Sequence, residues 1–328
     1  CSSDLKGSVQ AEAKIGRFIF EILAKEIDGK HSPAIDLIQK ALNVDTDDLT
    51  KIIKPIIVFP SEEEKRDVRE VNYPPDEDIK WDSCKQTIRE GFDNLANNMI
   101  EMGDSKNSLL VLERMVNFAC FSTFYYLANV NAVQHGGAAS PILIDAGDDT
   151  ESIKKASEHC YAAAKTAVED YYIESINAIL EKEVPRNTKA ACLEWIKHMT
   201  FSSESREKDI VSALNSYFES FSEESTDSIR SLAHALQIIL YTFDYKNNSP
   251  SDFCRVLGVR AGLIGPRGNR AKIKRYLVNS FILETITYSI LSVDDIKYGI
   301  ELKDLSIKAT NAYNILLGAD VRSEERRV

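Results

Sequence analysis

The sequence predicts a mainly α-helical protein, in which a multi-helix body precedes a C-terminal winged-helix-like module with a short basic β-hairpin. Two observations support this fold class. Apolar residues recur every three or four positions over most of the chain, which places them on one face of a helix. Near the C-terminus, the glycine-punctuated stretch "GLIGPRGNRAKIKRY" (262–276) interrupts that spacing between two capped helices.

Composition shifts along the 328 residues predict three parts, in line with the usual size of domains. The boundaries follow the turn-forming text "VPRNTK" and the Asn-, Ser- and Pro-rich text "DYKNNSPSD". The expected parts are an N-terminal helical domain (1–184) with a long exposed loop (60–82), a helical middle segment that packs on it (185–245), and the winged-helix-like module (246–328).

Caps define several of the expected helices. Ser32 is a candidate N-cap before Pro33, and Ser83 and Gln86 have the spacing of a capping box. Gly103 is a natural C-terminal stop for the helix that begins near Ser83.

A very apolar helix is expected from Ser108 to about Asn129. Its most apolar run has about 14 residues, fewer than the roughly 20 that span a bilayer, so we interpret it as a core helix and expect no membrane association. The text "PILID" then predicts a short extended segment before a long helix to about Glu183. Further helices are expected between residues 190 and 241, with the serine-rich text of 216–228 as a loop.

Charge and cysteine content narrow the functional classes. A formal net charge of −11 argues against a general nucleic-acid coat or a binder of anionic membranes, although it permits a local basic site. The six cysteines are widely spaced and form no CxxC pair, so we expect reduced thiols and a cytoplasmic protein.

Catalytic and metal-binding signals are weak, so we expect no cofactor and favour a non-enzymatic role. None of the five histidines has metal-ligand spacing. Asp145, Asp148 and Asp149 form the one carboxylate cluster that could bind a metal ion, as in a metal-dependent nuclease. The favoured interpretation is that Asp148 and Asp149 stabilise the start of the following helix, because no nuclease-type partner motif follows.

The C-terminal module contains the main functional signal. Ser249 and Pro250 are expected to start a helix that ends at Gly262, followed by a hairpin whose returning strand covers 273–278. Asn279 or Ser280 caps the next helix, and a last helix is expected over about 301–317.

Seven basic residues and no acid lie within 21 residues of this module, whereas the rest of the chain has a net charge of −18. Basic side chains neutralise phosphates and release counterions, and glycines would let the backbone approach a duplex. The expected DNA-contacting residues are Arg255, Arg260, Arg267, Arg270, Lys272, Lys274 and Arg275. The alternative is a protein–protein scaffold whose basic loop docks on an acidic partner.

The stretch "AGLIGPRGNRAKIKRY" before a capped apolar helix, together with "SPILIDAGDDTESIKKAS", resembles parts of large helical accessory proteins from bacterial anti-phage defence operons. This resemblance implies a DNA-sensing or complex-forming component that works with other protein subunits. It carries over no active-site residue.

Overall fold

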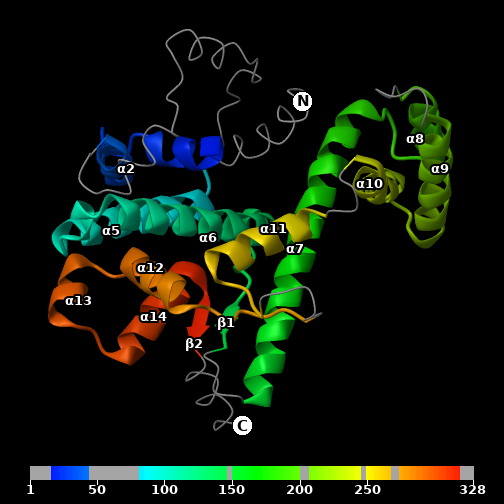
Figure 1. Ribbon diagram of the computed structural model, residues 1–328. Helices are drawn as coiled ribbons and strands as arrows, with labels where there is room; N and C mark the ends of the chain where they lie inside the picture. The colour runs from blue at the N-terminus through cyan, green and yellow to red at the C-terminus, as the bar shows by residue number, and fades with distance from the viewer. Residues whose placement is uncertain are drawn as a thin grey trace, which may run out of the picture. The chain divides into compact units, whose positions relative to one another are not determined.

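The computed structural model describes residues 16–43, 81–145, 150–199, 207–244, 249–266 and 273–317. Within these ranges the protein is mainly helical, with one two-stranded parallel sheet (Figure 1), which confirms the mainly α-helical part of the predicted fold class. The chain forms two compact units, and each is discontinuous in sequence. Unit 1 comprises Cys1–Tyr126, Pro141–Glu158 and Gly258–Val328, and unit 2 comprises Leu127–Ser140 and His159–Leu257. This division differs from the predicted boundaries near residues 184 and 245.

Unit 1 combines the N-terminal helices with the C-terminal ones. Its small sheet pairs β1 with β2 in parallel, with Ile142 opposite Ile315 and Ile144 opposite Leu317. Its elements are helical residues 16–24, α2 (Pro33–Asn43), α5 (Ser83–Glu101), η1 (Asp104–Lys106), the first part of α6 (Ser108–Gln134), β1 (Ile142–Ile144), the start of α7 (Glu151–Glu183), the last residues of α11 (Pro250–Ala261), α12 (Ser280–Ile290), α13 (Val293–Tyr298), α14 (Leu302–Tyr313) and β2 (Ile315–Leu317).

An aromatic cluster forms the centre of unit 1. The rings of Phe118 and Phe121 from α6 lie 6.3 and 5.1 Å from the ring of Tyr313, which ends α14. The rings of Phe92 on α5 and Phe118 form a T-shaped, edge-to-face pair with their centroids 4.7 Å apart. Gly91 makes this approach possible, because a Cβ at that position would lie 2.1 Å from the Tyr313 hydroxyl. The cluster therefore joins α5, α6 and α14.

A buried arginine holds the N-terminal helical residues against α5. Arg89 is 2% exposed, and its Nε donates to both carboxylate oxygens of Asp93 at 3.0 Å. Its terminal nitrogens donate to the backbone carbonyls of Ile22, Lys25 and Lys30. A buried guanidinium needs such a complete set of acceptors, so Arg89 fixes the end of the helix at 16–24.

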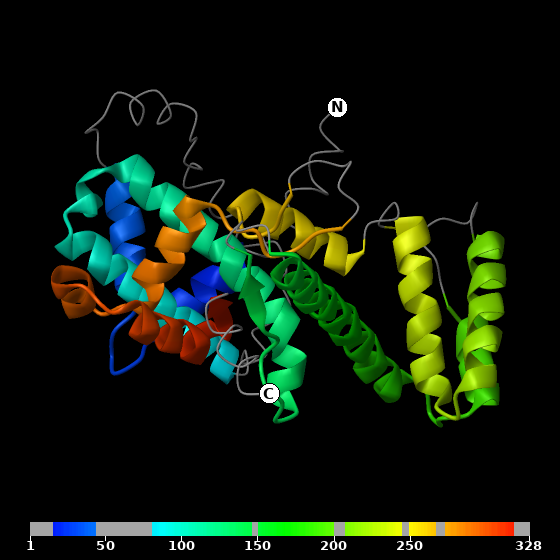
Figure 2. The same ribbon diagram turned by 90° about the horizontal axis from the view of Figure 1, so that it is seen from below.

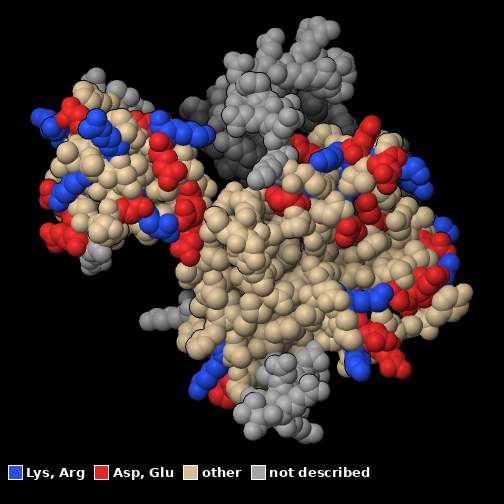
Figure 3. Space-filling view, turned by 180° about the vertical axis from the view of Figure 1, so that it is seen from behind, with Lys and Arg blue, Asp and Glu red and all other residues tan. Residues whose placement is uncertain are grey.

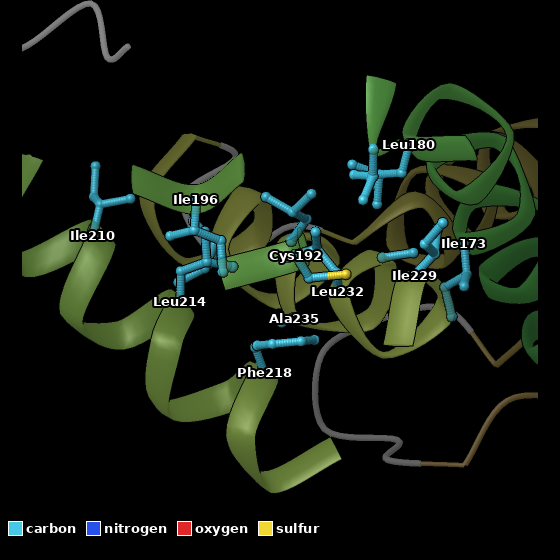
Figure 4. Close-up of a cluster of buried hydrophobic side chains, with 14 residues drawn as sticks. Ile173, Leu180, Cys192, Ile196, Ile210, Leu214, Phe218, Ile229, Leu232 and Ala235 are labelled. Carbon is cyan, nitrogen blue, oxygen red and sulfur yellow. The ribbon is translucent and has the colours of Figure 1, made fainter. Parts of the chain in front are cut away.

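Unit 2 contains a small helical bundle. Helices α9 and α10 lie side by side in both ribbon views (Figure 1, Figure 2). Leu214 and Phe218 of α9 pack with Cys192 and Leu232 in a fully buried apolar core (Figure 4). The elements of unit 2 are the remainder of α6 and α7, α8 (Lys189–Lys197), α9 (Glu207–Glu224), α10 (Ser228–Ile239), the π-helical turn η2 (Leu240–Asp244) and most of α11.

Local predictions at helix ends were partly confirmed. Pro33 starts α2 after Ser32, and Gly103 follows the end of α5 with φ +82°. The expected capping box of Ser83 and Gln86 is wrong, because Asp82 is the N-cap and its side chain accepts from Lys85 N. Asn129 does not end its helix, since α6 continues to Gln134.

Two expected loops or helices have a different structure. Most of the serine-rich text of 216–228 belongs to α9, because Leu214 and Phe218 place that helix in the core of unit 2. The expected last helix stops at Tyr313, where Asn314 adopts φ +51°. Ile315–Leu317 then form β2 instead.

We expect Gly91→Ala to destabilise unit 1. The added methyl would also lie 2.6 Å from Cζ of Phe118, and overpacking of a core costs about 1–3 kcal/mol. This cost exceeds the roughly 1 kcal/mol that alanine gains over glycine in a helix. Urea unfolding measures the change. Gly16→Ala is the matched control, because a Cβ there has nothing within 4 Å, and equal stability of the two variants would contradict the packing described here.

We expect Cys84, Cys192 and Cys254 to resist alkylation in the native protein. Burial raises the pKa of Cys84 and Cys192 to about 11 and that of Cys254 to about 12, so their thiolates are scarce at about pH 8. Among the five cysteines that the structure describes, the half-buried thiols of Cys120 and Cys160 should react with iodoacetamide before these three. Mass spectrometry of native and urea-unfolded samples checks this order, and rapid native labelling of Cys254 would contradict it.

Candidate nucleic-acid interface

The basic loop follows α11. We call the two described segments on either side of it, 262–266 and 273–279, its first and second arms, and both lie in unit 1. Gly265 and Arg275 exchange both backbone hydrogen bonds, at 3.0 and 2.9 Å, and Asn279 N donates to Gly262 O at 2.9 Å. The arms are therefore joined at two points. The predicted returning strand over 273–278 is wrong, since its described residues form only the isolated bridge at Arg275.

Tyr276 connects the second arm to other parts of unit 1. Its carbonyl accepts from Asp145 N at 2.9 Å, and its amide donates to Oγ of Ser157 on α7 at 3.0 Å. The ladder does not continue beyond the Gly265–Arg275 bridge, because the next pair bonds elsewhere: Leu263 N donates to Gly258 O at 2.8 Å, and Leu277 N donates to Arg275 O at 3.0 Å. The Tyr276 ring is fully buried and meets Phe124 at 6.2 Å.

Two of the glycines serve packing between the arms. Gly262 has φ +81°, and a Cβ there would lie 2.0 Å from Nδ2 of Asn279. A Cβ on Gly265 would lie 2.9 Å from Cβ of Leu277. At these two positions the absence of a side chain lets the arms approach each other, which differs from the expected role in approaching a duplex.

Arg275 forms a buried ion pair with Asp145. Its Nε donates to Oδ2 of Asp145 at 2.6 Å, with side-chain exposures of 16% for Arg275 and 0% for Asp145. Asp145 directly follows β1, so the pair joins the sheet to the second arm of the loop. One predicted phosphate ligand is therefore paired with one predicted metal ligand. In the sequence these two residues belong to separate hypotheses, and only the opposite signs of their charges link them.

The other expected DNA contacts are in different situations. Arg260 is exposed and forms no ion pair with another described residue. Arg255 is half-exposed and pairs with Asp252 on its own helix at 3.2 Å, and Lys274 Nζ donates to the carbonyl of Pro266. Arg267, Arg270 and Lys272 lie outside the described residues.

The metal-binding alternative has little structural basis. Asp145 is fully buried and its charge is balanced by Arg275, while Asp148 and Asp149 lie outside the described residues. Among the residues that the structure describes, no group of three or more His, Cys, Asp or Glu side chains could hold a metal ion.

The described part of the chain has no helix whose length and apolar character would suit a bilayer span.

The charge distribution elsewhere is mixed. On the face shown in Figure 3, Lys and Arg side chains are interspersed with Asp and Glu side chains. This contrasts with the acid-free stretch of seven basic residues between Arg255 and Arg275.

Comparisons with protein-family models, curated proteins and solved structures found no match to this chain.

We expect Arg275→Gln to destabilise the protein by about 3 kcal/mol, because it leaves the buried carboxylate of Asp145 without its ion-pair partner. Arg255→Gln is the matched control. It removes the same charge from a half-exposed pair, whose contribution is at most about 1 kcal/mol. Urea unfolding of both variants measures the difference, and similar losses would show that the Asp145–Arg275 pair has no special weight.

Proposed function

We propose that this chain is a non-enzymatic, DNA-binding or DNA-sensing subunit of a bacterial, defence-related assembly. The observation that carries the proposal is the concentration of seven basic residues without an acid in a chain of net charge −11. In this proposal the basic loop acts as the wing of a winged-helix-like module made from α11, the loop and α12. The two connections between its arms support this role, because an ordered loop base reduces the entropy lost on binding.

The structure refines which residues we assign to phosphate contacts. Arg267, Arg270 and Lys272 are the proposed main contacts, since they lie between the two arms in sequence. Exposed Arg260 at the end of α11 is the proposed fourth contact. We remove Arg275 from the set, because its guanidinium is directed to Asp145 inside the protein.

Lys274 and Arg255 have supporting roles in this proposal. Each bonds to a neighbour, Lys274 to the Pro266 carbonyl and Arg255 to Asp252. Lys274 bonds to a neutral group and therefore adds to the local potential that attracts a polyanion, whereas Asp252 offsets the charge of Arg255.

The second candidate function is a protein–protein scaffold whose basic loop docks on an acidic partner. The Asp145–Arg275 pair favours it, because it shows that a residue of this loop accommodates a carboxylate. This function predicts a stable co-purifying complex and no affinity for duplex DNA at physiological salt.

We expect the double variant Arg267→Glu/Arg270→Glu to lose salt-sensitive duplex binding. The slope of log K against log salt is negative, and each lost phosphate contact reduces its magnitude by about 0.9, so two lost contacts reduce it by about 1.8. Fluorescence anisotropy with a short labelled duplex across a salt series measures both affinity and slope.

Lys155→Glu/Lys197→Glu provides the control for this experiment. It changes the net charge equally at two lysines that are each 70% exposed and lie outside the loop. Unchanged binding by the loop variant, or equal losses in the two variants, would overturn the assignment of phosphate contacts. Absence of duplex binding by the wild-type protein would favour the scaffold.

A further inference from the structure

Three segments of unit 1 meet at the base of the basic loop. The end of β1 contributes Asp145, the first turns of α7 contribute Ser157, and the second arm contributes Arg275 and Tyr276. Within these few residues, Asp145 bonds twice to the arm, through its backbone amide to Tyr276 O and through its carboxylate to Arg275 Nε. Ser157 then bonds to the amide of Tyr276.

The ion pair is a charged contact between this arm and the residue that follows β1. Because the Asp145 side chain is fully buried, its carboxylate depends on this partner far more than a surface carboxylate would. The same Arg275 exchanges two backbone hydrogen bonds with Gly265 on the first arm. Arg275 thus connects the residue after β1, which its side chain binds, to the first arm, which its backbone binds.

We propose that Asp145 is a positioning residue for the basic loop. Its carboxylate holds Arg275 and thereby fixes the base from which the loop binds polyanions. This inference rests on the proposed function, and duplex DNA is its probe. It assigns a binding role to an acidic residue that has no contact with the DNA.

The proposal predicts a change in duplex affinity that is opposite to the change expected from electrostatic repulsion alone. Replacing an acid near a polyanion site by a neutral residue normally strengthens binding, because it removes repulsion. If Asp145 positions the loop, Asp145→Asn should instead weaken duplex binding roughly ten-fold, because a loop base that Asp145 no longer fixes must be fixed on binding. The salt slope should stay at the wild-type value, since the number of phosphate contacts is unchanged.

The experiment is a fluorescence-anisotropy titration of the full chain with a short labelled duplex across a salt series. Glu101→Gln is the matched control, because it removes one negative charge from a half-exposed pair with Lys297, outside the loop. Far-UV circular dichroism and urea unfolding establish the folded fraction of each variant, so that affinities refer to folded protein.

A second variant keeps the proposal testable if Asp145→Asn does not fold. Asp145→Asn/Arg275→Gln removes both charges together, so no buried charge is left unpaired. If Arg275 is an anchor, this variant should bind more tightly than Arg275→Gln alone and keep the wild-type salt slope. If Arg275 contacts a phosphate, both variants should show the same loss of duplex affinity, and the magnitude of their salt slope should be smaller by about 0.9.

The outcomes separate the two proposals. Weaker binding of Asp145→Asn at constant slope, with little change in Glu101→Gln, supports the positioning role. Tighter or unchanged binding of Asp145→Asn overturns that role and leaves the DNA-binding function standing. Absence of duplex binding by the wild-type protein overturns both.

Discussion

The base of the basic loop depends on one constraint, which is that a buried carboxylate must be partnered. Asp145 lies at the end of β1, where the small sheet, α7 and the second arm of the loop come together. Because Asp145 and Arg275 pair with each other inside the protein, neither charge is directed to solvent. The remaining features of the loop base, from the bridge at Gly265 to the amide contact with Ser157, are arranged around that pair.

This arrangement separates two roles that basic residues have within one short stretch. An arginine that faces a buried carboxylate contributes to the fold, whereas one that reaches solvent is available to a partner. Arg275 belongs to the first class and Arg260 to the second. A count of positive charges therefore overstates the number of groups that can neutralise phosphates, even where the sequence contains no acid between them.

Most of the secondary structure could be predicted from the sequence, because caps and apolar spacing are local signals. Pro33 and Asn279, for example, mark the starts of α2 and α12 as expected. The units could not be predicted, since unit 1 depends on contacts such as that between Gly91 and Tyr313, which no local pattern reveals. The sequence identified the basic loop as the candidate site, but it could not reveal the ion pair of Arg275, whose partner lies 130 positions away.

The aromatic centre of unit 1 also has a consequence for biosynthesis. Tyr313 is made roughly two hundred residues after Gly91, and β2 is made after that. During translation at about 5–20 residues per second, the N-terminal helices must wait many seconds for the side chain that fills their core. All of unit 2 is synthesised within that interval. The rings of Phe118 and Phe121 thus lack the Tyr313 ring that packs against them until α14 has been made.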